Sequence, residues 1–574
     1  GSSTLPLPLA VMLDDCGCFG PCVAWFRRAS DSTPSAHATV RKRLQDRTPT
    51  GANENTQADA FFCVNSARCS RSNSMVEGTT GRRSSMDIAS LLFCPDPSRS
   101  LGRHYKTVQQ LGEGAFGTVC SATHALTGER RAIKQVPKSD VQDDMQWVFT
   151  ELEAMARLDH PNVIKFYEFF EDAKMLYLVT ELCDAGDFSD LNHGVDDLLE
   201  IRLLFNDLLM AVSYCHDFGV AHRDLKFENC LLHFEEMRHR RVCKVIDFGL
   251  AAIRHPSEER TEWLKDQLGT RYFVAPEVID HTVTYGVTCD LWSIGVMLYI
   301  VLTDEHPFAV DACTMSTSIL FRKMLVKPTR KEPLDLAEVD REARDLIAKL
   351  LLKDPAKRIT ASKALQHEWL AGAVKSSLAG NRTQDMRKPK AEKSPKAPTF
   401  DKDLVSRIQH FGKCSKFERA VLTLAAHQAS NQEVEDLKAA FFELDVSRTG
   451  TLSKAEIKAG FKKCGHTISD NDLDNIFVVL DADESGKVCY TEWLAATLKP
   501  KLLASDKAID QLYQFFDLEG NGKVSPEELM HVLQDDDQVK EVLRRGDRAG
   551  DGHLSEEEFR CLIAGIAKSL GGKR

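Results

Sequence analysis

Residues 222–229, with the sequence His-Arg-Asp-Leu-Lys-Phe-Glu-Asn, bring together side chains suited to phosphoryl transfer. Asp224 can accept a hydroxyl proton, and Lys226 can stabilise the transferring group. Asn229, five residues after the Asp, can ligate a metal ion. Eight residues alone are only suggestive, so the other groups that this chemistry needs must be found elsewhere in the chain.

A glycine-rich segment at 111–119, Leu-Gly-Glu-Gly-Ala-Phe-Gly-Thr-Val, predicts two strands joined by a glycine turn. Glycine lets the backbone approach phosphates where a Cβ would obstruct. Dinucleotide-binding folds share this spacing but continue into a helix, whereas residues 131–134 predict a strand. The expected nucleotide contacts are Leu111, Gly112, Gly114, Gly117, Val119, Ala132 and Lys134, with Thr180, Glu181 and Cys183 at the end of the apolar strand 176–183.

Further charged residues complete the set in the required order. Lys134 would hold the α- and β-phosphates. Its partner should be a Glu on the amphipathic run 148–158, with Glu151 as first candidate and Glu153 as second. Asp247, in Asp-Phe-Gly, would join the Asn of the first motif as a ligand of Mg²⁺.

These motifs, followed by Ala-Pro-Glu at 275–277, resemble the eukaryotic protein kinases, specifically the calcium/calmodulin-dependent branch, over about residues 111–370. The resemblance implies a bilobal α+β kinase fold, ATP and Mg²⁺ as cofactors, and Asp224 as the general base. It also places two carboxylates, Asp187 and Glu228, where they would bind Arg preceding the phosphorylated Ser or Thr. Phe227 stands where the family usually has Pro, which should change only the stiffness of the loop.

Asp266, four residues before Thr270, resembles the position of an activating phosphate in such kinases. There it would neutralise Arg223 permanently. The alternative is an ordinary solvent-exposed Asp. The first interpretation predicts activity without phosphorylation of this loop, and tolerance of Thr261→Ala.

Four acidic twelve-residue loops follow, starting at 445, 481, 517 and 547, a spacing that fits two helix–loop–helix pairs. Each such loop needs oxygen ligands at positions 1, 3, 5, 7 and 9, Gly at 6 and Glu at 12 to bind Ca²⁺. The expected ligands are Asp445, Ser447, Thr449, Thr451 and Glu456, then Asp481, Asp483, Ser485, Lys487 and Glu492, then Asp517, Glu519, Asn521, Lys523 and Glu528, and finally Asp547, Asp551, His553 and Glu558.

The four loops differ in their ligands. The second and third have carboxylates at positions 1, 3 and 12, although Cys489 occupies position 9 of the second. The first has hydroxyls at positions 3 and 5, and Ala549 at position 3 of the fourth supplies no ligand. Because fewer charged ligands mean weaker binding, we expect the second and third loops to dominate, and the first and fourth remain open between weak sites and purely structural loops.

Between these regions the chain is polar up to 399 and then predicts a basic amphipathic helix. Its apolar stripe, interrupted at Gly412, is Leu404, Ile408, Phe411, Val421 and Leu424. This is a calmodulin-target pattern, with ordinary packing on a neighbouring helix as the alternative. The segment 371–430 carries a net charge of +7 (12 basic against 5 acidic side chains), and 431–574 carries −9 (19 against 28), which favours contact between them.

The whole arrangement resembles the calcium-dependent protein kinases of plants and protists. The expected domains are a disordered extension at 1–100, the kinase at 101–370, the linker and autoinhibitory junction helix at 371–430, and all-α, calmodulin-like EF-hand pairs at 431–500 and 501–574. The resemblance implies that the junction blocks the kinase until Ca²⁺ binds. Two alternatives stay open: an active kinase with EF-hands as a docking module, and a calcium-responsive pseudokinase scaffold.

Composition sets the remaining expectations. The chain of 574 residues is 43% hydrophobic and 28% charged, as in globular proteins of several domains. Its 17 cysteines show no CxxC lattice, which favours reduced thiols in the cytoplasm. Cys16, Cys18 and Cys22 would suit S-acylation and membrane association, with ordinary thiols in a tail as the alternative. We expect a monomer that acts on proteins with upstream basic residues and not on nucleic acid.

Overall fold

The computed structural model describes residues 100–570, apart from 115–116, 142–145, 192–196, 237–238, 255–262, 267, 281–282, 309–338, 373–401, 467 and 483–484. Predictions for the extension 1–99 with Cys16, Cys18 and Cys22, for Thr261 and for Asp483 therefore lie outside the described residues. In the described part of the chain, no helix has the length and apolar character needed to cross a membrane.

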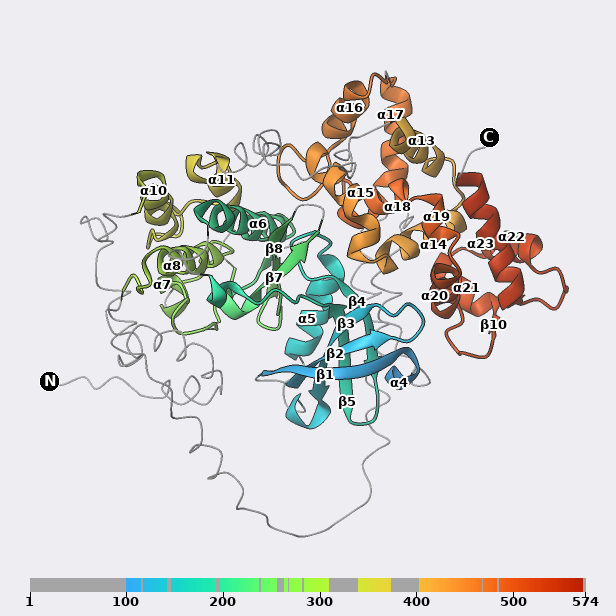
Figure 1. Ribbon diagram of the computed structural model, residues 1–574, viewed down its shortest axis with the longest axis horizontal. Helices are drawn as coiled ribbons and strands as arrows, with labels where there is room; N and C mark the ends of the chain where they lie inside the picture. The colour runs from blue at the N-terminus through green and yellow to red at the C-terminus, as the bar shows by residue number, and fades with distance from the viewer. Residues whose placement is uncertain are drawn as a thin grey trace, which may run out of the picture. The chain divides into compact units, whose positions relative to one another are not determined.

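The first lobe is a five-stranded antiparallel sheet in the order β1-β2-β3-β5-β4 (Figure 1). Its elements are α4 (Leu101–His104), β1 (Tyr105–Gly114), β2 (Gly117–His124), β3 (Arg130–Pro137), η1 (Lys138–Val141), α5 (Gln146–Arg157), β4 (Phe166–Glu171) and β5 (Met175–Glu181). A buried cluster holds the sheet together, formed by Tyr105, Ala122, Ile133, Tyr167, Phe170 and Val179. The sheet fixes β3 between β2 and β5, and so sets the position of Lys134.

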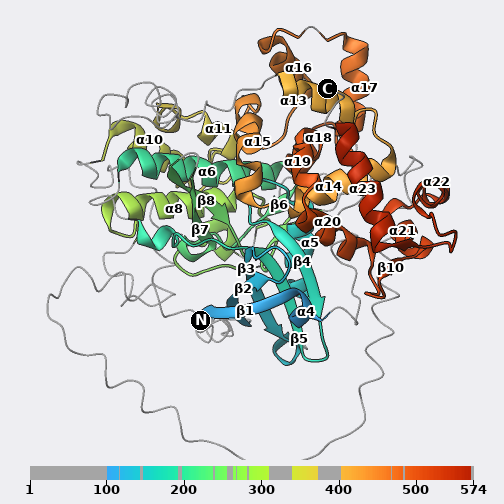
Figure 2. The same ribbon diagram turned by 45° about the vertical axis from the view of Figure 1, so that its right-hand side comes forward.

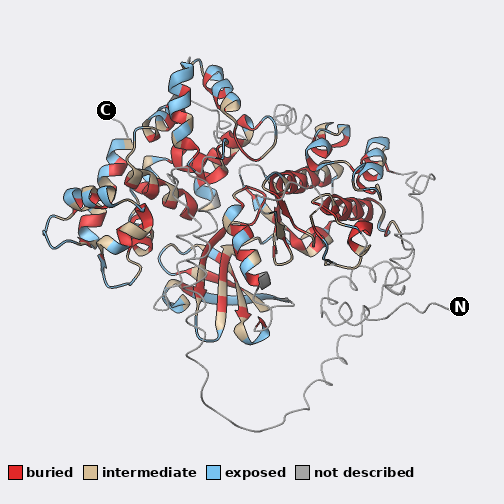
Figure 3. Cartoon of the chain, turned by 180° about the vertical axis from the view of Figure 1, so that it is seen from behind, coloured by how far each residue is buried: buried red, intermediate tan, exposed pale blue. Residues whose placement is uncertain are grey.

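The second lobe is mainly helical. It contains η2 (Phe188–Asp190), α6 (Leu198–Asp217), β6 (Val220–Ala221), η3 (Phe227–Asn229), β7 (Cys230–Glu235), β8 (Arg240–Val245), β9 (Ala252–Ile253), α7 (Pro276–Ile279), α8 (Cys289–Thr303), α10 (Arg341–Leu350) and α11 (Ala361–Leu365). Fourteen consecutive residues of α8, from Cys289 to Leu302, are buried, and in Figure 3 this helix has almost wholly the red colour of buried residues. A helix that is apolar on all sides is typical of a domain centre.

The junction forms two helices rather than one. α13 (Lys402–Phe411) ends before Gly412, and α14 (Lys416–Gln428) begins at the capping box of Ser415 and Glu418. The expectation of a single junction helix was therefore wrong, because the capping box starts a new helix after the turn. All five residues of the apolar stripe are buried. α13 packs against α17 and α18, and α14 packs against α18, α20, α21 and α22.

The EF-hand region continues directly from α14, as Figure 2 shows. The first pair comprises α15 (Asn431–Leu444), α16 (Lys454–Lys463), α17 (Asp470–Leu480) and α18 (Tyr490–Thr497). The second comprises α20 (Asp506–Phe516), β10 (Lys523–Val524), α21 (Pro526–Leu533), α22 (Asp536–Gly546), β11 (Leu554–Ser555) and α23 (Glu556–Leu570), after the short α19 (Pro500–Leu503). Leu452 and Val488 bridge the loops of the first pair, and β10 with β11 joins those of the second.

Candidate active site and calcium loops

Lys134 on β3 lies between two carboxylates from other elements. Its Nζ is 2.8 Å from both carboxylate oxygens of Glu151 on α5, and 3.4 Å from Oδ1 of Asp247. Glu153, the second candidate, instead pairs with Arg157 on the surface. The structure thus brings Lys134, Glu151 and Asp247 together at the junction of the two lobes.

The charges of this cluster are mutually stabilising. Burial would lower the pKa of Lys134, but the carboxylates of Asp247 and Glu151 outweigh it and raise that pKa. Burial would likewise raise the pKa of Asp247, yet Lys134 and Lys226 hold it below the usual value. Lys134 is therefore a cation and Asp247 an anion at neutral pH, as binding phosphates and Mg²⁺ requires.

Asp224 is held by three neighbours. Lys226 Nζ lies 2.9 Å from its Oδ2, and Thr270 Oγ1 donates a hydrogen bond to its Oδ1 at 2.5 Å. The amide of Asn229 donates to the backbone oxygen of Asp224 at 2.9 Å and to Oδ2 at 3.3 Å. Asp224 is only 7% exposed, so its carboxylate has a fixed orientation within the second lobe.

Thr270 was not among the predicted site residues. Its Oγ1 also accepts a hydrogen bond from Lys226 Nζ at 3.4 Å, which closes a ring of three polar groups. The sequence signal was its position shortly before Ala275-Pro276-Glu277, but only the fold brings it to the carboxylate.

Asp290, at the start of the buried helix α8, anchors the segment 222–229 that carries Asp224. Its oxygens accept the backbone N–H groups of His222 and Arg223 at 2.9 and 2.8 Å. Arg223 has φ of 66°, and Asp247 has φ of 62°, so both occupy the left-handed region that costs most residues about 1 to 3 kcal/mol. The surrounding contacts maintain this strain. Asp290 accepts the backbone N–H of Arg223, and Lys134 pairs with the side chain of Asp247.

Arg223 also reaches the loop that follows β9. Its Nη1 donates to Asp266 Oδ2 at 3.2 Å, and its Nε donates to the backbone oxygen of Leu250 at 2.7 Å. Asp266 is therefore located where it can serve as a permanent negative partner. Because its side chain is 69% exposed, the pair is screened by solvent.

The expected nucleotide contacts line β1, β2, β3 and the end of β5. Gly112 pairs with Val119, and Gly114 with Gly117, across the glycine turn. A Cβ on Gly117, which has φ of +145°, would lie 2.1 Å from the backbone oxygen of Gln135, so only glycine fits there. Leu111 is exposed, whereas Val119, Ala132, Thr180 and Cys183 are partly buried.

Glu181 behaves differently from the other expected nucleotide contacts. Its side chain is buried and accepts hydrogen bonds from Lys165 N at 2.8 Å and Lys244 Nζ at 2.6 Å. Its own N–H donates to the Lys165 backbone oxygen at 2.9 Å. This residue therefore fixes the end of β5, and its N–H is already engaged.

The two carboxylates predicted to bind basic substrate residues are electrostatic neighbours. Burial raises the pKa of Asp187, the N–H and hydroxyl of Ser189 lower it, and the negative charges of Asp190 and Glu228 raise it further. Repulsion of this kind is relieved by a bound cation. The role of Asp187 and Glu228 in binding an arginine side chain stays a prediction.

All four calcium loops have the local geometry of an ion-binding loop. Glycine at position 6 has φ between 73° and 82° in Gly450, Gly486, Gly522 and Gly552. The N–H of each of these glycines donates to the Asp at position 1, at 2.8 or 2.9 Å. The Glu at position 12 accepts backbone N–H groups from the start of its loop: Glu456 from Ser447, Glu492 from Ala482, Glu528 from Glu519, and Glu558 from Arg548 and Ala549.

The remaining predicted ligands lie between positions 1 and 12 of their loops. In the first loop Thr449 Oγ1 donates to the backbone oxygen of Thr451, and in the second Ser485 donates to that of Lys487. Lys523 of the third loop pairs with Asp551 of the fourth at 2.8 Å. Asn521 donates to Glu519, and His553 Nδ1 lies 3.0 Å from the Asp551 backbone oxygen.

The carboxylates of the first and fourth loops differ in environment. Burial raises the pKa of Asp445 in the first loop to about 6. In the fourth loop, hydrogen bonds from Ser555 and the backbone lower the pKa of Glu558 to about 2. Both loops retain oxygen donors at positions 1 and 12, so the residues present fit Ca²⁺ in all four, with fewest carboxylates in the first.

The first EF-hand pair contacts the kinase lobes through polar groups. Asp159, which follows α5, accepts the backbone N–H of Thr491 at 2.5 Å and its hydroxyl at 2.9 Å. Arg448 donates to Asn206 on α6 at 3.2 Å. A Cβ on Gly450 would lie 2.1 Å from His160 Cδ2, so this glycine also permits the close approach. Asp159 had no signal in the sequence, because its partner is 332 residues away.

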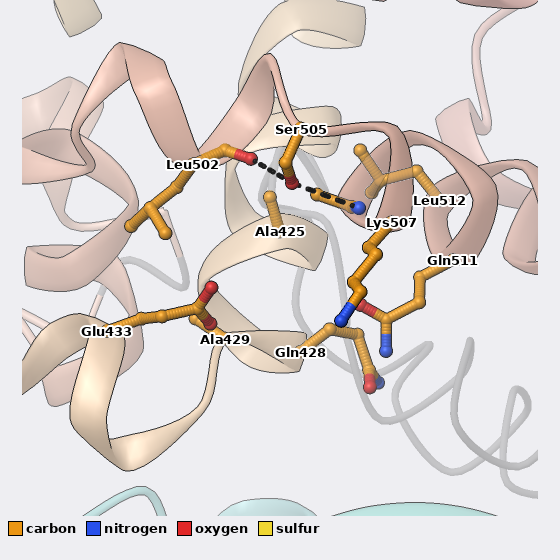
Figure 4. A pocket seen from close by; sticks show the side chains of 10 residues that line it. Ala425, Gln428, Ala429, Glu433, Leu502, Ser505, Lys507, Gln511 and Leu512 are labelled. Carbon is orange, nitrogen blue, oxygen red and sulfur yellow. Dashed lines mark hydrogen bonds between the residues drawn. The ribbon is translucent and has the colours of Figure 1, made fainter. Parts of the chain in front are cut away.

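A cavity of about 150 Å³ lies outside the catalytic cleft, between the end of α14 and the start of α20. Figure 4 shows Gln428, Lys507 and Gln511 among the residues that line it. The Ser505 hydroxyl donates a hydrogen bond to the backbone oxygen of Leu502 and accepts one from the N–H of Ala508. It contains none of the predicted catalytic or calcium-binding residues, so it does not bear on the chemistry of either site.

The fold and these motifs define the chain as a protein kinase followed by an EF-hand region. Residues 105–370 match the family described as protein kinase domain, 522–563 match an EF-hand domain pair, and 509–533 match an EF hand.

Curated relatives narrow this class. Calcium-dependent protein kinase 12 of Arabidopsis thaliana is 32% identical over 384 residues, covering 66% of this chain and 72% of that protein. Calcium-dependent protein kinase 28 of Oryza sativa subsp. japonica is 31% identical, with coverages of 66% and 67%. The chain belongs to the calcium-dependent protein kinase family, which confirms the resemblance drawn from its sequence.

Proposed function

We propose that this protein is a calcium-activated serine/threonine kinase that transfers the γ-phosphate of ATP to protein substrates. The observation that carries the proposal is the assembled cluster of Lys134, Glu151 and Asp247 facing Asp224 and Lys226. A scaffold that had lost catalysis would have no need to maintain these charges against burial.

Each residue of the cleft has a distinct part in this chemistry. Asp224 accepts the proton of the substrate hydroxyl, and Lys226 stabilises the negative charge on the transferring group. Lys134, oriented by Glu151, holds the α- and β-phosphates. Asn229 and Asp247 would hold Mg²⁺, which neutralises charge on the phosphates when bound.

We further propose that Asp187 and Glu228 select substrates with Arg before the acceptor residue. Two neighbouring carboxylates favour the bidentate, always charged guanidinium. A peptide library should therefore show a preference for upstream Arg. Selection of upstream acidic residues, or of Pro directly after the acceptor, would contradict this assignment.

The junction is the proposed regulatory element. In this structure the stripe Leu404, Ile408 and Phe411 is buried by the EF-hand helices α17 and α18. We infer that this is the released arrangement, in which the sensor withholds the junction from the cleft. Ca²⁺ can shift the balance only by binding this arrangement more tightly than the inhibited one.

The experiment that tests the function is a phosphate-transfer assay on a basic peptide, with saturating Ca²⁺ and with a calcium chelator. The proposal predicts strong transfer with Ca²⁺ and little with chelator. Equal rates in both conditions would favour EF-hands that serve only for docking. No transfer in either condition, with nucleotide still bound, would favour the pseudokinase scaffold.

A further inference from the structure

A pair of buried aromatic rings lies in the second lobe, next in sequence to groups that hold Asp224. Phe227, the first residue of η3, and Phe273 have ring centroids 5.5 Å apart and ring planes at 83°. The two residues are only 5% and 4% exposed. Edge-to-face rings at this distance attract one another beyond the area that they bury. The pair is a feature of this chain, since Phe227 stands where the family usually has Pro.

The ring pair joins two segments that both contact Asp224. Phe227 follows Lys226, whose Nζ lies 2.9 Å from Asp224 Oδ2. Phe273 closes a turn that begins at Thr270, because its N–H donates to the Thr270 backbone oxygen at 2.9 Å. Thr270 Oγ1 in turn donates to Asp224 Oδ1 at 2.5 Å. Each ring is therefore close along the chain to a side chain that holds the carboxylate.

Both segments are also anchored on the buried helix α8. Ser293 on α8 donates a hydrogen bond to the backbone oxygen of Phe273 at 2.8 Å. Asp290 on the same helix accepts the N–H groups at the start of the segment 222–229. The contact between the rings of Phe227 and Phe273 is a further connection between the two segments.

The turn at 270–273 lies directly against the segment 222–229. Gly269, which precedes it, has φ of +121°, and a Cβ there would lie 2.7 Å from the backbone oxygen of Arg223. Glycine permits this approach because it has no Cβ. A short hydrogen bond tolerates little displacement, so a shift of the turn away from the segment would separate Thr270 from Asp224.

We propose that Phe227 is a positioning residue for phosphoryl transfer: its ring, packed against Phe273, holds the turn so that Thr270 keeps its hydrogen bond to Asp224. Thr270 then fixes the orientation in which Asp224 accepts the proton of the substrate hydroxyl. The phosphates of ATP are held by other groups, so the ring pair affects the rate of transfer rather than ATP binding. This inference rests on the proposed kinase function, and its tests separate the two.

The first test measures kcat and the KM for ATP on a basic peptide, with the full-length chain and saturating Ca²⁺. Phe227→Leu keeps an apolar side chain and removes the ring. It should lower kcat about tenfold, because small displacements near the reacting atoms are costly, and it should leave the KM for ATP within about twofold of wild type. Phe273→Leu, which removes the other ring, should do the same. Wild-type kcat in both variants would overturn the inference.

Phe170→Leu is the matched control. Phe170 on β4 is 3% exposed and makes an edge-to-face pair with Tyr105, at 6.0 Å and 81°. The lost packing is alike, but this pair lies in the first lobe. The Tm should fall by a similar amount in Phe170→Leu and Phe227→Leu, whereas kcat of the control should stay within about twofold of wild type. An equal loss of kcat in the control would show that lost packing alone slows transfer, and would overturn the inference.

A second background shows whether Phe227 acts through Thr270. Thr270→Val keeps the shape of the side chain and removes the hydroxyl, so it should itself lower kcat about tenfold or more. If the ring serves to place that hydroxyl, adding Phe227→Leu to Thr270→Val should lower kcat by less than about twofold further. A further loss of about tenfold would mean that the ring acts independently of Thr270, against the proposal.

Amide hydrogen exchange tests the ring contact without turnover. The N–H groups of Phe273 and Val274 donate to the Thr270 backbone oxygen at 2.9 and 3.1 Å. They should exchange several-fold faster in Phe227→Leu than in the wild type or in Phe170→Leu, and unchanged exchange would overturn the inference. A wild type that transfers no phosphate to the peptide would refute the proposed kinase activity. Exchange alone would then decide whether the ring of Phe227 holds the turn.

Discussion

The catalytic cleft and the calcium loops both depend on carboxylates, but they stabilise them in different ways. In the cleft, Glu151 and Asp247 lie against Lys134, and Asp224 lies against Lys226. These partners come from different strands, helices and loops. In the calcium loops, Asp and Glu accept N–H groups from within the same twelve residues, as in Asp481 with Ser485 and Gly486.

This difference separates chemistry from sensing. In the cleft, each carboxylate is held by a cation from a distant part of the sequence. Replacing one of the two therefore also leaves the other without the contact that orients it. A loop that organises itself through its own backbone persists when one ligand changes, and then loses affinity by degrees. Changes in the cleft should therefore abolish transfer, whereas changes in the loops should shift its calcium dependence.

The largest effect is expected in the cleft. Lys134→Met and Asp247→Asn should each lower phosphate transfer by more than about a hundredfold, because each removes a charge that acts on the transferring group. Calcium binding, measured by calorimetry on the same proteins, should stay unchanged. Retention of more than about a tenth of wild-type turnover in both variants would show that the cleft has been wrongly assigned.

Removal of the sensor comes next. A chain that ends near Gly380 lacks both junction helices and all four loops, so its transfer rate should be the same with Ca²⁺ and with chelator. A surviving calcium response would be incompatible with the assignment of the sensor. The absolute rate is also informative: high activity indicates release of a block, and low activity indicates that the sensor supports the kinase lobes.

Single loops should give a graded effect. Glu492→Gln and Glu528→Gln should raise the Ca²⁺ concentration for half-maximal activity several-fold more than Glu456→Gln, because their loops carry more carboxylates. Titrations of peptide phosphorylation against free Ca²⁺ measure this directly. An equal or larger shift in Glu456→Gln would mean that the first loop, beside the kinase lobes, dominates the switch.

The contact between Asp159 and Thr491 should give a smaller shift. Asp159→Ala leaves the Thr491 N–H and hydroxyl without this acceptor, at a cost of about 1 to 3 kcal/mol. Because Thr491 precedes the ligand Glu492, we expect about 1 kcal/mol of this cost to be coupled to Ca²⁺ binding, which would raise the Ca²⁺ requirement about threefold to tenfold. Thr491→Val, which keeps the N–H, should do less; identical titration curves for Asp159→Ala and wild type would exclude coupling through this contact.

The smallest effect is expected at Asp266. Its exposed pair with Arg223 contributes about 0 to 1 kcal/mol, so Asp266→Asn should reduce turnover by no more than about fivefold. Thr261→Ala should be tolerated. Mass spectrometry of the active protein should find the loop unphosphorylated. A large loss in Thr261→Ala that an upstream kinase repairs in the wild type would overturn this interpretation.

The sequence by itself determined the family and the calcium loops. Each loop is organised by short-range hydrogen bonds, and Ser at position 9 with Glu at position 12 forms a helix capping box in the first and third loops, at Ser453 and Ser525. Such interactions depend only on spacing. The kinase motifs were equally readable, because phosphoryl transfer requires particular residue types in a fixed order.

The tertiary structure alone decided which distant groups meet. Thr270 contacts Asp224 across 46 residues, Asp159 meets Thr491 across 332, and Lys438 meets Glu235 across 203. It also divided the junction into two helices and buried their apolar stripe against the sensor. The local sequence around each residue carries no information about these contacts. They become favourable only when the fold packs the two partners together and excludes water from them.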